Sequence, residues 1–232
     1  MFVEKFLKGR KMVRRTKEEA LETRNHLLDA AEEVFYRDGF ARTSLDAVAE
    51  AAGVTRGAIY WHFKNKSDLF NAMCDRVHLP MEQLAESVNQ ETTGDPLDHM
   101  RKVAVFFLQE CEHNPHFRKI IEILWKKTEF VDPSDAIYIR QHEAAMSGRE
   151  HITKSLSRAV ETKHLSPDTD IRLAALLLQA SIEGILQNWL LAPEYFSLAE
   201  EAERLVDACF DTIRNASSLK MAGKQAKEEE KG

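Results

Sequence analysis

The side chains best suited to chemical recognition lie in the run TRGAIYWHFKNK, residues 55–66. In a helix, which turns about 100° per residue, Ile59 and Phe63 share one face, while Gly57, Ala58 and Trp61 lie opposite. The guanidinium of Arg56 suits two parallel hydrogen bonds to guanine, and the Ala58 methyl suits a thymine methyl. Hydroxyl, imidazole and ammonium groups suit phosphates, which fix position without reading sequence. The predicted DNA-contacting residues are Thr43, Ser44, Thr55, Arg56, Gly57, Ala58, Tyr60, Trp61, His62 and Lys66.

A second helix is needed to hold this one in place, and residues 45–52 predict it. Its apolar residues recur every three or four positions, as on one helical face. Thr43 or Ser44 can cap its start, and Gly53 suits a turn that needs positive φ. Thr55 can cap the helix that follows. The spacing therefore predicts a helix-turn-helix. A three-helix scaffold without a DNA role is the alternative, but it leaves the outward Tyr-Trp-His cluster without a packing reason.

The runs ARTSLDAVAEAAGV and TRGAIYWHFKNKSDLF resemble the TetR family of transcriptional regulators, and the opening MVRRTKEEALETR resembles its AcrR-type branch of multidrug-efflux repressors. The resemblance implies an all-α fold with an N-terminal three-helix DNA-binding domain and a C-terminal helical domain for ligand binding and dimerisation. It also implies an operator on double-stranded DNA that is released when a small hydrophobic effector binds. Two recognition helices in successive major grooves predict an inverted-repeat operator. The Glu183 carboxylate in an apolar wall favours a cationic or flat aromatic effector, because such a carboxylate is costly unless a cation or donor pairs with it. A regulator of catabolic or lipid genes in the same family, or a non-specific architectural DNA-binding protein, are the alternatives.

Charge is distributed unevenly along the chain. The net charge is −6, yet residues 1–66 hold 13 Lys and Arg against 10 Asp and Glu, a balance of +3. The rest of the chain therefore carries −9. This asymmetry predicts a basic end that faces phosphate and an acidic body held away from it.

Four segments are expected along the chain: a loose basic arm at 1–15, the DNA-binding domain at 16–75, the ligand-binding and dimerisation domain at 76–215, and a disordered tail at 216–232. The first helix should begin near Thr16, with Leu21, Leu28, Ala31 and Phe35 facing inward. Ser67 should cap a long helix that Pro80 kinks or ends. Another long helix should begin at residues 132–134. No long apolar run or secretory signal is present, which predicts a cytoplasmic protein.

The helix expected at 170–191 is apolar around most of its circumference, so it must be covered on two sides. Together with the last helix it predicts a four-helix interface between two subunits, with the core of a single subunit as the alternative. The predicted contacts of this homodimer are Ile182, Leu186, Trp189, Leu205 and Phe210.

Glu183 is the one charged residue in the middle of that apolar helix. The resemblance implies that it lies at the effector pocket, with Ile121 and Trp125 where relatives place polar pocket groups. A solvated stripe of Arg172, Gln179, Glu183 and Gln187 is the alternative interpretation. No catalytic set, metal-binding cluster or cofactor motif emerges from the spacing, so we expect no enzyme, metal or cofactor. The three cysteines are far apart and predict neutral thiols.

Overall fold

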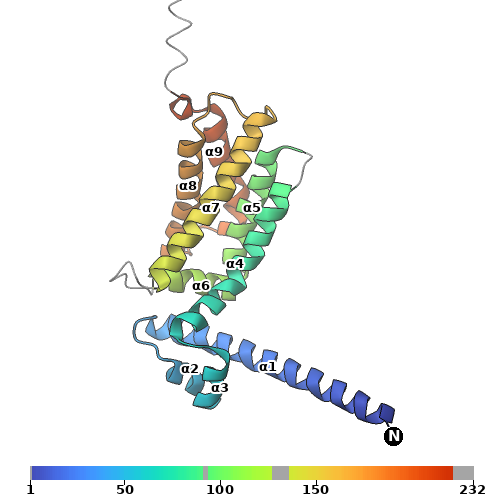
Figure 1. The fold of residues 1–232 in the computed structure, drawn as a ribbon. Helices are drawn as coiled ribbons and strands as arrows, with labels where there is room; N and C mark the ends of the chain where they lie inside the picture. The colour runs from blue at the N-terminus through green and yellow to red at the C-terminus, as the bar shows by residue number, and fades with distance from the viewer. Residues whose placement is uncertain (1, 91–93, 127–135, 222–232) are drawn as a thin grey trace, which may run out of the picture. The chain divides into compact units, whose positions relative to one another are not determined.

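The structure, a computed structural model, describes residues 2–90, 94–126 and 136–221. Over these residues it contains helices and a single isolated bridge between Thr169 and Lys220 (Figure 1). The predicted all-α class is therefore confirmed. No helix in the described part of the chain is long and apolar enough to cross a membrane.

The chain divides into two compact units. The first comprises Met1–Arg76 and Lys119–Ile137, and the second comprises Val77–Arg118 and Tyr138–Gly232. The first division lies next to the boundary predicted after residue 75, whereas the segment Lys119–Ile137 groups with the first unit instead of with the body. Three helices, α4 (Lys66–Gln90), α6 (Pro115–Lys126) and α7 (Ala136–Glu161), have residues in both units. Pro80 lies inside α4 and does not end it.

The first unit is built on α1 (Phe2–Asp38), with α2 (Leu45–Ala51), α3 (Arg56–His62) and the start of α4. The expected loose arm is wrong, because residues 2–15 form the first turns of α1. Within the expected inward stripe, the prediction that Leu21 faces inward is wrong, since its side chain is 58 % exposed. The other members are buried, and Phe35 forms an aromatic cluster with Phe40 and Phe70, with ring centroids 5.0–5.6 Å apart.

Two side-chain hydrogen bonds fix the start of α4. Asn65 Oδ1 accepts from the Asp68 amide at 2.8 Å, and Asp68 Oδ2 accepts from the Lys64 amide at 2.9 Å. The expected cap at Ser67 is wrong by two positions, because the Asn65 side chain caps the helix by accepting from the Asp68 amide.

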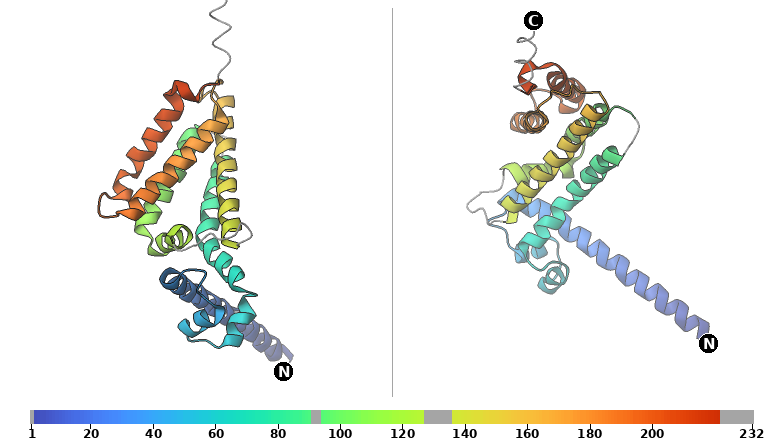
Figure 2. Two further views of the ribbon diagram at one scale, coloured as in Figure 1. Left: turned by 90° about the vertical axis from the view of Figure 1, so that its left-hand side faces the viewer. Right: turned by 45° about the horizontal axis from the view of Figure 1, so that its top comes forward.

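The second unit contains α5 (Pro96–His113), α7 from Tyr138 onward, α8 (Ile171–Leu191) and α9 (Leu198–Asn215). Helix α9 packs along α5 and α8, and Figure 2 shows α8 and α9 side by side. The start predicted for α7 at 132–134 lies outside the described residues. Residues 216–221, expected to be disordered, are ordered: Leu219 is buried in a short 3-10 turn, and its carbonyl accepts from the Asp170 amide at 2.8 Å. The rest of the predicted tail lies outside the described residues.

One arginine ties α5 to α9. Arg101 donates from Nε to Asp207 Oδ1 at 2.5 Å and from Nη2 to Asp207 Oδ2 at 3.1 Å. Its Nη2 also donates to Glu203 Oε2 at 3.1 Å. This two-pronged geometry is the strongest form of the ion pair, and it holds the pKa of Asp207 below its usual value.

Because the folded-state pKa of Asp207 is lowered, its contribution to stability is present above the unfolded pKa of about 3.9 and is lost as the pH falls through the folded value. We expect Arg101→Gln to lower the free energy of unfolding near neutral pH. The deficit should shrink as the pH falls from about 6 to about 3. Urea titrations across that range test this, with Arg204→Gln, an exposed arginine paired within its own helix, as the control. A deficit that is independent of pH would contradict the role of this pair.

Candidate DNA interface and effector site

The helix-turn-helix forms at the predicted residues. Ser44 caps α2 by accepting from the Ala47 amide at 3.1 Å, and Thr55 caps α3 by accepting from the Ala58 amide at 3.2 Å. Between the helices Gly53 has φ +64°, the left-handed conformation that glycine adopts without strain. Ile59, with no exposed surface, holds α3 against the unit.

The opposite side of α3 is open to solvent. Trp61 is 72 % exposed and Tyr60 is 47 % exposed, although both are large side chains that usually favour burial. At Gly57 an added Cβ would meet only Thr55 Oγ1, at 3.9 Å. Nothing in the folded unit therefore requires glycine there, whereas a partner that approaches the backbone closely would.

Arg56 lies at the N-terminal edge of this surface in a weakly held position. Its Nε is 3.0 Å from Asp46 Oδ1, and its guanidinium lies 5.5 Å from the centre of the Tyr60 ring. The Arg56 side chain is 72 % exposed, and pairs this exposed contribute little stability. The guanidinium can therefore exchange Asp46 for a base edge at low cost.

Two of the predicted DNA contacts form hydrogen bonds that hold the unit together. Thr43 is 4 % exposed, and its hydroxyl donates to the Gly39 carbonyl at 2.8 Å. Lys66 donates from Nζ to the carbonyls of Phe40 at 2.8 Å and Ala41 at 3.2 Å, and its ammonium lies over the Phe40 ring. The polar groups of Thr43 and Lys66 are thus bonded to the loop between α1 and α2, and a DNA contact by either residue stays a prediction.

His62 is half-buried beside the exposed surface. Desolvation, and then the nearby charge of Arg24, lower the pKa of His62 below its usual value of about 6.5. At neutral pH its ring is therefore uncharged, so it is suited to hydrogen bonding more than to ion pairing with a phosphate. Arg24 also lies 5.2 Å from the centre of the Phe63 ring. Sequence reasoning missed Arg24 because its contacts with the end of α3 come from a distant part of the chain.

The predicted effector residues are divided between the two units. Ile121 is buried and Trp125 is half-buried, both in the part of α6 that belongs to the first unit. Glu183 lies on α8 in the second unit and accepts from Gln179 Nε2 at 2.9 Å. Gln179 is only 9 % exposed, so the solvated stripe does not extend to it, although Arg172 and Gln187 are exposed. That these three residues line one cavity stays a prediction.

The residues predicted at the dimer interface fall into two groups, buried and partly exposed. Leu186, Trp189 and Phe210 are at most 1 % exposed within one protomer, so they have no surface to offer a partner and belong to its core. We correct the prediction for these three residues. Ile182 and Leu205 keep part of their surface.

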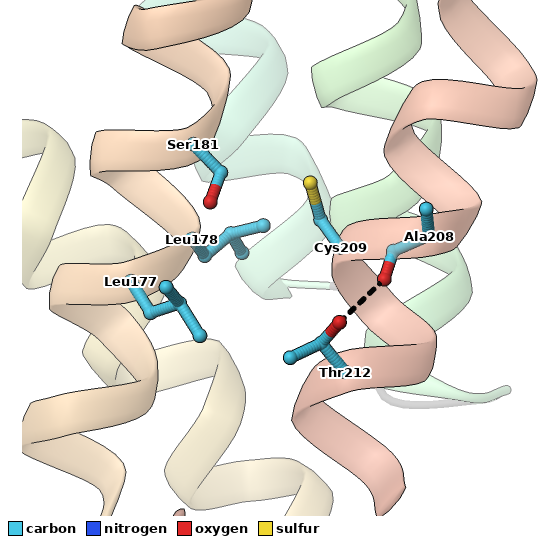
Figure 3. Close-up of a pocket in the computed structure, with 6 residues that line it drawn as sticks. All are labelled: Leu177, Leu178, Ser181, Ala208, Cys209 and Thr212. Atoms are coloured by element: carbon cyan, nitrogen blue, oxygen red, sulfur yellow. Dashed lines mark hydrogen bonds between the residues drawn. The ribbon is translucent and has the colours of Figure 1, made fainter. Parts of the chain in front are cut away.

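Helices α8 and α9 do leave a shallow groove of about 230 Å³ between them (Figure 3). It is lined by Leu177, Leu178, Ser181, Ala208, Cys209 and Thr212. Burial raises the pKa of the Cys209 thiol, as it does that of Cys111, so both thiols are neutral. Within the described part of the chain, no group of three or more potential ligands is placed to hold a metal ion.

Comparison with known proteins agrees with this architecture. Residues 27–73 match the family described as bacterial regulatory proteins, tetR family, and residues 95–215 match the MAATS-type transcriptional repressor, C-terminal region. The regulator TtgR of Pseudomonas putida is 41 % identical over 209 residues, which cover 90 % of this chain and all of that protein. The chain belongs to the TetR family of transcriptional regulators and carries its helix-turn-helix at α2 and α3.

Two solved structures show the same fold. NalD, the secondary repressor of the MexAB-OprM multidrug efflux pump in Pseudomonas aeruginosa, is 34 % identical, with a TM-score of 0.76 over 86 % of this chain and 99 % of its own. SmeT in complex with triclosan is 29 % identical, with a TM-score of 0.78 over 87 % of this chain and 96 % of its own. SmeT is the repressor of a multidrug efflux pump of Stenotrophomonas maltophilia.

The revised role of Lys66 is open to a direct test. Lys66→Met removes two charge-assisted hydrogen bonds, so we expect it to lower the free energy of unfolding by about 1–2 kcal/mol. Lys64→Met, at an exposed neighbour, should leave stability nearly unchanged. Thermal unfolding of both variants tests the structural role of Lys66, and equal stability of the two variants would contradict it.

Proposed function

We propose that the chain is a homodimeric repressor of multidrug efflux genes that a small hydrophobic effector releases from an inverted-repeat operator. The observation that carries the DNA half is the open face of α3, where Gly57 and Trp61 are exposed to solvent and Ala58 is partly exposed. A large exposed aromatic beside a glycine that local packing does not require is suited to the major groove. Such a repressor acts in the cytoplasm, where its operator lies.

The efflux assignment is supported by the relatives. NalD and SmeT, over most of their lengths similar to this chain, are repressors of multidrug efflux pumps. The complex of SmeT with triclosan supports a small-molecule effector for this chain as well. A ligand can release DNA only if it binds the DNA-free conformation more tightly than the DNA-bound one.

The dimer is proposed on the groove between α8 and α9. Its lining combines leucine side chains with small residues, which let a partner helix approach closely. A pair of helices from each subunit would form a four-helix interface with isologous contacts. Two recognition helices would then reach successive major grooves about 34 Å apart, which requires a pseudo-palindromic operator.

Base recognition by Arg56 is tested by selecting bound sites from random duplexes. The wild type should enrich an inverted repeat, and Arg56→Ala should cost about 1–3 kcal/mol and relax preference at one base pair per half-site. Arg37→Ala, an exposed arginine at the end of α1, is the matched control. Selection without enrichment would identify a non-specific DNA-binding protein instead.

Assembly is tested at the exposed edge of the groove. Ala208→Glu places a carboxylate in the proposed interface without disturbing the protomer core, because Ala208 is exposed. We expect monomers in sedimentation velocity and operator affinity at least tenfold weaker, since each monomer holds a single half-site. Lys154→Glu on α7, also exposed, should stay dimeric. An Ala208→Glu dimer with wild-type affinity would place the interface elsewhere.

A further inference from the structure

An ion pair joins the two helices of the helix-turn-helix on their solvent-exposed side. Asp46 Oδ1 on α2 lies 3.0 Å from Arg56 Nε on α3, and the two side chains are 49 % and 72 % exposed. Asp46 is in the first turn of α2, and Arg56 directly follows the Thr55 cap of α3. The backbone at both residues is therefore helical, and the fold itself holds a carboxylate beside this guanidinium.

The pair uses the inner nitrogen of the guanidinium. Nε is the nitrogen nearest the main chain, and the terminal nitrogens Nη1 and Nη2 of Arg56 have no hydrogen-bond or ion-pair partner among the described residues. These terminal nitrogens carry the remaining N–H donors of the guanidinium fork. The Tyr60 ring, whose centre lies 5.5 Å from the guanidinium, contacts the same group from within α3. Two neighbours thus restrict Arg56 without occupying its terminal nitrogens.

This arrangement suits a contact with guanine. Two parallel hydrogen bonds from Nη1 and Nη2 to guanine O6 and N7 leave Nε beside Asp46, so the arginine can read the base without giving up the ion pair. A side chain that is oriented before binding loses less conformational entropy on binding than one that is not. Bound DNA also excludes water from the pair, and the lower effective dielectric strengthens it.

The same carboxylate acts against the competing partner of Arg56, the DNA phosphate. Arginine forms strong bidentate contacts with phosphates, which are present at every position of every duplex. A phosphate that approaches the Arg56 guanidinium meets the like charge of Asp46 at close range, whereas guanine O6 and N7 carry only partial charges. Repulsion of a competing partner raises specificity.

We propose that Asp46 is a positioning residue for base recognition: it orients Arg56 through Nε, stays paired in the operator complex and disfavours phosphate as a partner for the same guanidinium. Asp46 itself contacts no base. This inference rests on the proposed function, in which Arg56 reads a base pair, and it extends that function to an acidic residue of α2. Loss of Asp46 should therefore strengthen binding to DNA in general and weaken discrimination between sequences.

A purely structural role of Asp46 predicts a different result. A carboxylate in the first turn of a helix interacts favourably with the helix dipole, so Asp46 also stabilises α2. That role changes the free energy of unfolding but not the preference for one base pair. Base preference is therefore the measurement that separates the two roles.

The experiment measures base preference and general affinity separately on the full-length protein. Wild type, Asp46→Ala and the control Glu50→Ala are bound to a pool of duplexes with randomised sequence and to the duplex that the wild type enriches from it. A third duplex carries a replacement, in one half-site, of the base pair at which Arg56→Ala loses its preference. The preference ratio is the dissociation constant for this third duplex divided by that for the enriched one. Glu50 is exposed on the same helix and carries the same charge.

Both alanine variants should bind the randomised pool about two- to fivefold more tightly, because each removes a charge that repels phosphate. Only Asp46→Ala should lower the preference ratio, by about two- to tenfold, the effect of orienting one side chain in advance. Asp46→Asn keeps an acceptor oxygen without the charge and should give a ratio between those of wild type and Asp46→Ala. In an Arg56→Ala background, Asp46→Ala should not change the ratio further.

Thermal unfolding shows which variants are folded, and Asp46→Asn, with nearly the native shape, carries the test if Asp46→Ala is unfolded. Equal tightening on all three duplexes by the Asp46 variants would overturn the inference, because it would mean that Arg56 exchanges Asp46 for the base. An equal loss of preference in Glu50→Ala would overturn it too, since charge alone would then be responsible. Both results leave the proposed function standing. The proposed function fails, and this inference with it, if the wild type enriches no repeat or if Arg56→Ala relaxes no base pair.

Discussion

The direction of α3 relative to α2 depends on the turn at Gly53. Gly53 adopts φ +64°, and around it the Gly53 amide donates to the Glu50 carbonyl and the Val54 amide to the Ala49 carbonyl, both at 3.0 Å. These bonds satisfy the last carbonyls of α2 while the chain reverses direction. A side chain at Gly53 would be strained in this conformation by roughly 1–2 kcal/mol. Because α3 begins two residues later at its Thr55 cap, any change in the turn would alter the direction of the whole recognition face.

Local features of the chain could be predicted well from the sequence. The caps Ser44 and Thr55 lie where side-chain oxygens precede apolar periodicity, and each accepts the amide hydrogen bond expected of a cap. Helical spacing also identified which side of α3 is buried, because Ile59 and Phe63 are four residues apart. Such features depend on contacts between residues one or two helical turns apart, and these residues are close together in the sequence.

Long-range side-chain contacts could not be predicted in this way. Lys66 appeared as a surface cation beside the recognition helix, yet its ammonium is bonded to carbonyls 25 and 26 residues earlier in the chain. Leu186 and Phe210 belong to an apolar pattern that is the same whether these residues are buried within one protomer or against a partner. Burial distinguishes the two cases, and it depends on the packing of α5, α8 and α9 together.

The same limitation explains the different readings of Glu183. From the sequence, a lone carboxylate on an apolar helix indicates either a solvated stripe or a site for cations. The structure places Arg149, 34 residues away along the chain and on another helix, at the far side of the Gln179 amide. A carboxylate in that setting is not an isolated negative charge, because the Gln179 amide donates to it and the Arg149 guanidinium lies on the other side of that amide. In the second unit, the environment of Glu183 depends on the packing of α7 against α8. In the first unit, the exposed surface of α3 is formed by consecutive residues of one helix.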